Sequence, residues 1–352
     1  MEQTVKYENL VITIKELLHA NRQKVFNTIN QTVSLTYWEI GKYIVEYEQN
    51  GEDRAKYGLS LLDNLSNDLA INFGKGFSVR NLRLFRQFYQ TFPIWQSMIA
   101  ETSEPIQQLV IAKKSILNQA FKHISWTHLV RLLSVKNENE RNFYLIESVN
   151  NNWTVRELNR QINSGLFERL LINRDEDKIN EIINLGHQLN QPEDLIRDPY
   201  VLEFLGLKDN FSFSENDLES AIIENLSSFL LELGKGFSFV SRQYRISSTD
   251  EHYFIDLVFY NRLLKCHVLI DLKIGKLKHQ DIGQMQMYVN YFDRVVKVDH
   301  ENPTVGIILC KEKNDFVIEY SLPINNQQIF AKEFMLYFPD KELLNKFLKK
   351  YI

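Results

Sequence analysis

Two acidic residues and a lysine interrupt runs of sequence that otherwise read as buried β-strands. In the run KCHVLIDLKI, alternate side chains share a face of the strand, so Asp271 and Lys273 lie together. In the preceding run, HYFIDLVFYN, Asp256 is a single acid among apolar neighbours. A hairpin with an even-numbered loop, such as Arg262-Leu263, puts Asp256 on the same face as Asp271 and Lys273. The spacing therefore predicts that two carboxylates and an amine converge.

Charged groups in a buried strand must pair with each other, lie at a cleft or bind a cation, because an uncompensated charge in an apolar core is costly. Mg²⁺ prefers oxygen ligands, usually one or two carboxylates with waters and substrate phosphate. Asp256 and Asp271 could supply these carboxylates, and Lys273 could orient or deprotonate a metal-bound water. The residues therefore predict metal-dependent hydrolysis of a phosphodiester. A satisfied buried ion pair is the alternative interpretation.

The elements that position these residues follow the order α, β, β, β, α, β. We expect a helix over residues 217–233, strands over 237–247, 252–261 and 265–274, a helix over 280–292 and a strand over 304–309. The first helix offers a third carboxylate, from Glu219 or from Glu224, which are five positions apart and need not share a face. We favour Glu219, because it stands in the stretch LESAII that leads into the helix core.

The first half of the chain reads as helices. Apolar spacings near 3.6 residues predict helices over residues 10–30 and 33–48, and a leucine-rich helix then ends near Asn72. A glycine turn follows, after which Ser78 is the expected N-cap of a helix that stops at Pro93. The outline is helix, turn, helix.

The second of these helices has a basic face formed by Arg80, Arg83 and Arg86, and Lys75 lies in the turn before it. Helix-turn-helix and winged-helix proteins place such a helix in the major groove of DNA, with its basic residues toward phosphates and bases. We therefore expect these four residues to contact DNA. An amphipathic helix with a solvated arginine face is the alternative interpretation.

Length and composition define the broad class. The 352 residues exceed the roughly 100 to 200 typical of one domain, so two domains are expected. The chain is 44% apolar and 24% charged with a formal charge of -4, which excludes a uniformly basic nucleic-acid coat and a disordered chain. The longest apolar run, residues 334–338, is far below the roughly 20 residues of a membrane span. Because the N-terminus also lacks a secretory pattern, we expect a cytoplasmic protein.

A polar stretch between residues 170 and 200, broken by Gly186 and Pro192, marks a domain boundary. The predicted division is a helical domain over residues 1–172, a linker over 173–194, a second domain over 195–340 and a helical tail over 341–352. Neither a G-x-x-x-x-G-K-[ST] loop nor a G-x-G-x-x-G turn follows a strand, which argues against a nucleotide-binding enzyme.

These residues resemble the PD-(D/E)XK nuclease superfamily in its αβββαβ order. The matching positions are Glu219, Asp256, the Asp271-x-Lys273 pair and Gln284-x-x-x-Tyr288. The longer strings LESAIIENLSSFLLELGKGFSFVSRQY and FIDLVFYNRLLKCHVLIDLKIGK look more narrowly like the YhcG-type bacterial proteins. The resemblance implies an α+β protein of two domains, a mostly helical, winged-helix-like domain for DNA binding or docking followed by a restriction-endonuclease-like domain.

The resemblance also implies cleavage of DNA with Mg²⁺, for which Mn²⁺ substitutes. Glu219, Asp256 and Asp271 would be metal ligands, and Lys273 would lie at the attacking water. Asp271 replaces the usual Glu of the triplet, so this ligand arm is one methylene shorter. Gln284 would belong to the catalytic group on the helix beside the site.

The remaining contacts with DNA would come from Tyr288, near the substrate phosphate, and from Arg242 and Lys276, each of which could instead be an ordinary surface cation. The implied partners are DNA, a second copy of the chain and subunits of a restriction system, without a membrane. The implied setting is restriction, phage defence or DNA repair. The alternative is a nuclease-fold subunit that has lost activity and serves DNA binding or assembly.

Overall fold

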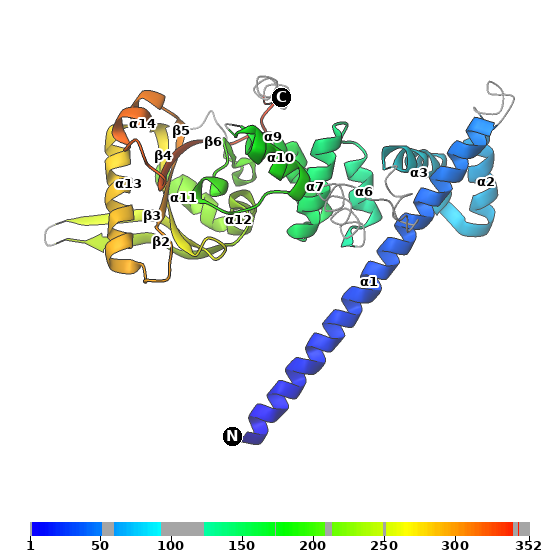
Figure 1. Cartoon of the computed structure of the whole chain (residues 1–352), viewed down its shortest axis with the longest axis horizontal. Helices are drawn as coiled ribbons and strands as arrows, with labels where there is room; N and C mark the ends of the chain where they lie inside the picture. The colour runs from blue at the N-terminus through cyan, green and yellow to red at the C-terminus, as the bar shows by residue number, and fades with distance from the viewer. Residues whose placement is uncertain are drawn as a thin grey trace. The chain divides into compact units, whose positions relative to one another are not determined.

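The computed structural model describes residues 2–50, 60–92, 123–172, 174–207, 213–248, 251–340 and Leu344 (Figure 1). The chain divides into two compact units, Met1–Asn159 with Ile183–Gly186, and Arg160–Ile182 with His187–Ile352. Within the described ranges, no helix combines the length and the apolar character that a membrane span requires. The predicted helix stop at Pro93 and, apart from Leu344, the predicted tail over 341–352 lie outside the described residues.

The described part of the first unit is helical. Its elements are α1 (Glu2–Asn50), α2 (Leu61–Phe73), the 3₁₀ turn η1 (Gly74–Phe77), α3 (Val79–Thr91), α6 (Trp126–Leu132) and α7 (Glu138–Asn150), and α8 (Val155–Asn163) begins in it. The two helices predicted over residues 10–30 and 33–48 are a single helix, because neither proline nor glycine separates them. The predicted helix, turn and helix are present as α2, η1 and α3, and Ser78 caps α3 by accepting a hydrogen bond from Asn81 N at 3.4 Å.

One apolar cluster of this unit lies where α3 packs on α1 and α2. Leu82 and Phe85 of α3 are buried against Ile44 of α1 and Leu62 of α2. The backbones approach so closely that a Cβ on Gly41 would lie 2.0 Å from the carbonyl oxygen of Phe85. Only glycine fits this position of α1, because any larger side chain would force the two helices apart. Helix α3 is thereby oriented by its apolar side, and its arginine side remains outward.

The second unit is built on a mixed six-stranded sheet in the order β1-β6-β5-β4-β3-β2 (Figure 1). The strands are β1 (Tyr200–Val201), β2 (Phe237–Ser247), β3 (His252–Asn261), β4 (Cys266–Lys276), β5 (Val305–Glu312) and β6 (Ile329–Met335). Strands β2, β3 and β4 are antiparallel, whereas β4, β5, β6 and β1 pair in parallel. The predicted order α, β, β, β, α, β over residues 217–309 is confirmed, and β1 and β6, which were not predicted, extend the sheet.

Helices cover both faces of this sheet. On one face are α11 (Glu215–Glu224) and α12 (Leu226–Leu233), and on the other are α13 (His279–Tyr291) and α14 (Asp315–Ser321). The unit also contains α9 (Leu166–Leu171), most of α10 (Glu176–Leu185) and the short helical turns η2 (Pro192–Leu195), η3 (Glu203–Leu205) and η4 (Phe292–Val296). The helix predicted over residues 217–233 is interrupted at Asn225, whose ψ of 30° leaves the helical region, so α11 and α12 are separate.

The two faces of β4 explain why a charged pair can be buried there. Val268, Ile270 and Leu272 pack with α11 and α12, as their common parity predicts. Leu269, of the opposite parity, packs with α13 on the other face. Asp271 shares this second face, so the helix that covers the sheet also covers the carboxylate.

Candidate active site

Strands β3 and β4 bring the two predicted acids together where their pairing ends. The last paired residues are Leu257 and Ile270, and continuing this register by one residue sets Asp256 across from Asp271. The connecting loop, residues 262–265, has four residues rather than two, and it keeps the even parity that the prediction needs. Beyond the last pair, Asp256 Oδ2 accepts a hydrogen bond from Leu272 N at 2.8 Å. The carboxylate thus takes the place of a backbone carbonyl and is held between the strands.

Lys273 is paired with Asp271 on β4. Its Nζ lies 2.8 Å from Asp271 Oδ2, and Asp271 is only 2% exposed. A second acid, Glu215 in the first turn of α11, has its Oε2 3.8 Å from the same Nζ, and its Oε1 accepts a hydrogen bond from Ile274 N at 3.4 Å. The sequence reasoning missed Glu215, because a helix-start acid next to Ser214 reads as ordinary capping.

Gln243 on β2 connects the remaining carboxylates. Its Nε2 donates hydrogen bonds to Asp256 Oδ1, at 3.1 Å, and to Glu219 Oε2. The backbone of Gln243 has a φ of 48°, in the left-handed region that a non-glycine residue rarely adopts. Of the two candidate upstream acids, Glu219 is buried beside Asp256, whereas Glu224 is exposed.

The charges of this cluster are not balanced. Burial raises the pKa of Asp271 to about 7, Lys273 opposes the rise and Asp256 adds to it. Burial also raises the pKa of Glu219, with the hydrogen bond from Gln243 opposing and Asp256 adding. For Lys273 burial lowers the pKa, but the nearby carboxylates outweigh it and the net shift is upward. Lys273 is therefore charged at neutral pH and is suited to orienting a water or phosphate rather than to deprotonating one.

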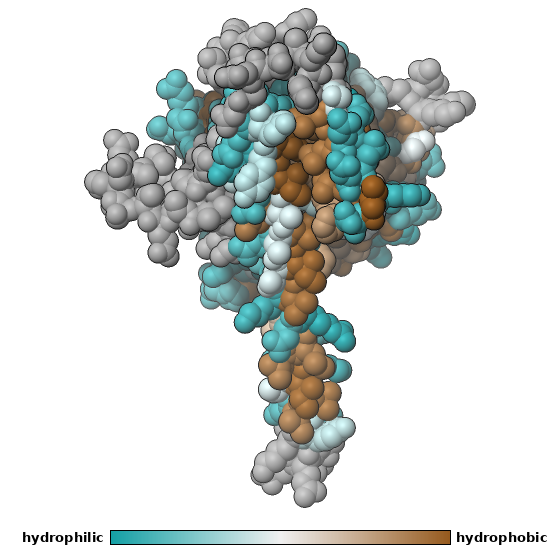
Figure 2. All heavy atoms as spheres, turned by 90° about the vertical axis from the view of Figure 1, so that its right-hand side faces the viewer, coloured by the Kyte–Doolittle hydropathy of each residue, from teal (hydrophilic) through white to brown (hydrophobic). Residues whose placement is uncertain are grey.

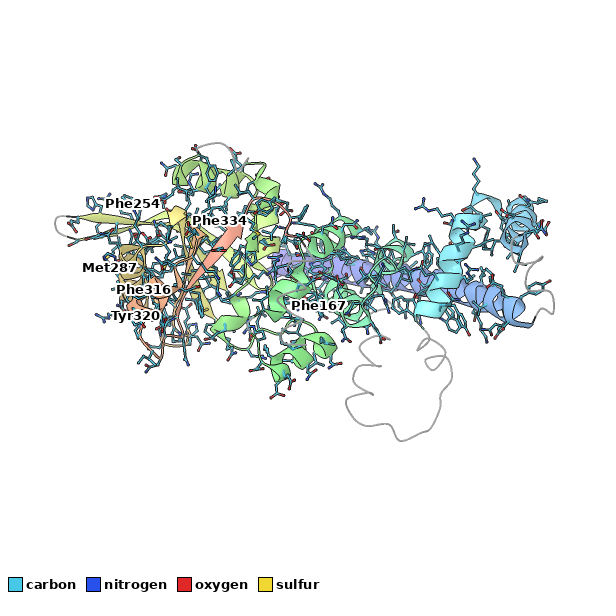
Figure 3. The ribbon with its side chains drawn as sticks, turned by 90° about the horizontal axis from the view of Figure 1, so that it is seen from above. Phe167, Phe254, Met287, Phe316, Tyr320 and Phe334 are labelled. Carbon is cyan, nitrogen blue, oxygen red and sulfur yellow. The ribbon has the colours of Figure 1, made fainter. Side chains whose placement is uncertain are left out.

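Two residues of α13 lie beside this cluster. Gln284 Nε2 donates to Tyr288 Oη at 2.7 Å, and Tyr288 Oη donates to the carbonyl oxygen of Phe254, labelled in Figure 3, at 2.8 Å. Tyr288 is fully buried, and burial together with the charge of Asp271 raises its pKa to about 12. Tyr288 therefore has no exposed surface with which to meet DNA, and its hydroxyl fixes the β3 backbone two residues before Asp256.

The other predicted DNA contacts lie on the surface. In the second unit, Arg242 is exposed, and Lys276 forms an exposed ion pair with Glu312 at 3.0 Å. In the first unit, Lys75, Arg80 and Arg83 are exposed, whereas Arg86 Nη1 forms a 2.7 Å ion pair with Glu48 of α1.

The donor set can be tested for its fit to a divalent cation. Among the described residues, no preformed group of three or more histidine, cysteine, aspartate or glutamate side chains is arranged to hold a metal. The donors that are present are carboxylate oxygens, the ligands that Mg²⁺ prefers. The buried Asp271 Oδ2 contacts Lys273 at 2.8 Å but has no aligned hydrogen bond, and burial raises the pKa of this carboxyl. Asp256, Asp271 and Glu219 therefore fit a hard cation in chemistry.

Comparison with known proteins matches almost the whole chain. The family described as the YhcG PDDEXK nuclease domain matches residues 193–349, and the family described as the DUF1016 N-terminal domain matches residues 13–169. A protein of Escherichia coli (strain K12) named "Putative nuclease YhcG" is 38% identical, over 97% of this chain and 93% of the relative.

Two solved structures are also similar to part of the chain. A crystal structure of a repair endonuclease from Pyrococcus abyssi matches at 15% identity and a TM-score of 0.25, covering 38% of this chain and 50% of that chain. The structure of EndoMS in apo form matches at 15% identity and a TM-score of 0.24, covering 37% and 48%. At these scores, neither likeness carries an argument.

Proposed function

The chain belongs to the YhcG family of PDDEXK nucleases, and on this premise we propose that it hydrolyses phosphodiester bonds of DNA with the help of Mg²⁺, for which Mn²⁺ substitutes. The observation that carries the proposal is the convergence of three carboxylates, Asp256, Asp271 and Glu219, beside the single ammonium of Lys273. Structural ion pairs are mutually neutralised, whereas a site that receives a cation keeps surplus negative charge.

Each residue has a distinct proposed role. Asp256, Asp271 and Glu219 would hold the cation. Leu272 N orients Asp256, and the side chain of Gln243 donates to both Asp256 and Glu219 and so holds them in place. When bound, the metal would stabilise the charge on the attacked phosphate and make a bound water more acidic. The ammonium of Lys273 would orient that water or a phosphate oxygen. Gln284, held by Tyr288, would lie beside the substrate.

Incubation of the purified protein with plasmid and linear DNA tests this function. We expect cleavage with Mg²⁺ or Mn²⁺ and none with EDTA. Lys273→Met removes an electrostatic contact with the reacting group and should lower the rate by roughly 100- to 1,000-fold. Arg262→Ala, at an exposed cation in the loop between β3 and β4, is the control and should change the rate by less than about threefold. Cleavage that survives both EDTA and Lys273→Met would refute the proposal.

A second candidate is an inactive nuclease-fold subunit for DNA binding or assembly. It is favoured by the fact that Asp271 already has an ammonium partner and that both oxygens of Asp256 already accept hydrogen bonds. For such a protein, Asp271→Asn would leave the biological function unchanged. A metal-dependent cut that is abolished by Asp271→Asn eliminates it.

We also propose that the helical region binds or docks on DNA in the manner of a winged helix, through Lys75 and the outward side of α3. The exposed Arg80 and Arg83 would contact phosphates, and Arg86 would contribute less, because it already pairs with Glu48. The double change Arg80→Ala, Arg83→Ala should weaken binding and reduce the slope of log affinity against log salt by about two. Lys136→Ala, another exposed cation of this unit, should leave the slope unchanged.

The division into domains over residues 1–172 and 195–340 remains a proposal. Limited proteolysis should cut within 173–194. The fragments should stay associated, because Arg160 and Arg169, upstream of the cut, form ion pairs with Glu232, downstream of it. Cuts confined to other segments would refute this division.

For the cellular setting we propose a cytoplasmic protein that acts in restriction, phage defence or DNA repair, with subunits of a restriction system as partners. Deletion of the gene, followed by phage plating and survival after DNA damage, tests this setting. Unchanged plating and unchanged survival would count against it.

A further inference from the structure

The N-terminal half of α1 carries an exposed apolar stripe, which Figure 2 shows in brown along the helix. We define the α1 stripe as Leu10, Ile14, Leu17, Leu18, Val25 and Ile29, each of which is 46 to 60% exposed. At 100° per residue these positions fall within about 120° of the helix circumference, so they form one face. Single exposed apolar residues need no explanation, but six on one face, four before Asn21 and two after it, indicate a contact surface.

The other half of the same helix shows what this face lacks. From Trp38 onward, one side of α1 is buried: Trp38, Ile44 and Val45 are in the core, and Trp38 Nε1 donates to the carbonyl oxygen of Phe92 at 3.2 Å. Among the described residues, the hydrogen bond between α1 and another segment that lies nearest the N-terminus is at Asn27, whose Nδ2 is 3.0 Å from His123 Nδ1. An isolated helix is marginal in water unless an apolar face is packed, so the N-terminal half requires a partner.

The exposed apolar area of the stripe is close to what each partner contributes to a stable dimer interface. A half-exposed large apolar side chain presents roughly 100 Å², so six present about 600 Å², and the polar flanks bring this close to the roughly 800 Å² that each partner gives to a stable interface. In a two-fold interface both copies use the same patch. A stripe along one straight helix can pair with its own copy in this way, so no second patch is needed.

The charges beside the stripe select the direction of pairing. Between Glu8 and Lys24, the charges that flank the stripe are Glu8 and Lys15 in its N-terminal part, a net charge of 0, and Arg22 and Lys24 in its C-terminal part, a net charge of +2. In a parallel pair, the two cationic ends would lie side by side and repel. In an antiparallel pair, the cationic end of each helix lies against the end that carries Glu8.

We propose that two copies of this chain associate through an antiparallel pairing of their α1 stripes. The dimer does not depend on the proposed nuclease function. If that function holds, the pairing supplies two active sites to one assembly, one for each strand of a duplex.

The mass of the full chain in solution is the direct test. Sedimentation equilibrium at micromolar concentration should give twice the 41.7 kDa of one chain. The double change Leu10→Lys, Leu17→Lys places charges in the stripe and should weaken the dimer by at least about 100-fold. Ile12→Lys makes the same kind of change at a residue that is 52% exposed on the opposite side of α1, and it should leave the mass unchanged.

Three results would overturn the pairing. The first is a monomer for the unchanged chain. The second is a dimer that survives the double change Leu10→Lys, Leu17→Lys. The third is a dimer that Ile12→Lys weakens as much as the double change does. A monomer whose thermal midpoint falls in the stripe variant would assign the stripe to a segment of the same chain. Circular dichroism of each variant confirms that the remaining helices are folded.

A spin label on Asn9→Cys tests the direction. In an antiparallel pair centred near residue 18, the labels are about 27 Å apart along the axis, at 1.5 Å per residue. In a parallel pair they lie within about 15 Å, and that result would overturn the antiparallel arrangement. The native cysteines, Cys266 and Cys310, are both buried and should not take the label.

Discussion

Asp271 is the residue at which burial and charge oppose each other most clearly. Because burial raises its pKa to about 7, the folded protein binds this proton more tightly than the unfolded chain does. The linkage then has a definite sign. Between about pH 4 and pH 7 the folded state holds more protons than the unfolded state, so this group's contribution to stability falls as the pH rises through that window.

The change Asp271→Asn should therefore stabilise the metal-free protein at pH 8, although it removes a residue of the proposed site. We expect its thermal midpoint in EDTA to exceed that of the unchanged chain by roughly 5 °C at pH 8 and to equal it at pH 4. Differential scanning calorimetry at the two pH values measures this. A lower midpoint at pH 8 would show that the ion pair with Lys273 outweighs the cost of burial.

Gln243 is a positioning residue, since it bonds to Glu219 and Asp256 and to no other described group of the site. Gln243→Leu should lower the single-turnover rate by roughly 10- to 100-fold, the value of hydrogen bonds to charged groups. Because the hydrogen bond lowers the pKa of Glu219, its loss should also shift the acidic limb of the pH–rate profile upward. Ser247→Ala, at the exposed end of the same strand, is the control. A slower rate with an unmoved limb would indicate only a structural role.

At the level of elements, α13 has two functions in the nuclease unit. Its apolar residues Ile282, Met285 and Val289 are buried on the sheet, and this packing carries Gln284 and Tyr288 to the site. The hydroxyl of Tyr288 is the link, because it ties the helix to the backbone of β3 at Phe254. A helix that both covers the core and orients the strand edge couples the stability of the fold to the geometry of the site.

Tyr288→Phe separates this interpretation from direct contact with DNA. Loss of the hydroxyl leaves the Phe254 carbonyl without its donor and should reduce the free energy of unfolding by about 1 to 3 kcal/mol. DNA affinity should change little, because the ring is fully buried. Urea denaturation and fluorescence anisotropy measure the two quantities. Weaker binding at unchanged stability would restore Tyr288 as a DNA contact.

At the level of the molecule, a buried ion cluster joins distant segments of the second unit. Glu232 of α12 is fully buried and forms ion pairs with Arg160 at 3.0 Å, Arg169 at 2.5 Å and Arg197 at 3.4 Å. It also accepts a hydrogen bond from Val201 N at 2.9 Å. Burial alone would raise the pKa of Glu232, but the three arginines outweigh it and hold the pKa at about 2.

Glu232→Gln should lower the free energy of unfolding at pH 7 by about 3 to 5 kcal/mol, because the buried Arg169 and Arg197 lose their counter-ion. Because the pKa of Glu232 is lower in the folded state, this group stabilises the fold at pH values above its unfolded pKa, near 4.5. The contribution is lost as the pH falls toward 2. The difference between variant and unchanged chain should therefore shrink below about pH 4. Chemical denaturation across pH measures it. Glu224→Gln, at an exposed position, should change stability by less than about 0.5 kcal/mol.

The sequence by itself determined the order of elements around the site and the sharing of faces within it. Alternation along a strand is local, so Asp271 and Lys273 had to lie on one side of β4, and any even loop sets Asp256 on that side too. The same locality predicts the helix, turn and helix that end in α3. Where the prediction was wrong, the error was also local: α1 continues through residues 30–33, and α11 ends at Glu224, before Asn225.

Only the tertiary structure decided how the charges of the site are balanced. Gln243 reaches Glu219 and Asp256 through a backbone conformation that no periodic pattern signals, and Glu215 reaches Lys273 because α11 begins beside the end of β4. Burial of Tyr288 and the raised pKa of Asp271 follow from α13 covering the sheet. These properties depend on distances and solvent exclusion between segments far apart along the chain, which spacing within one segment does not contain.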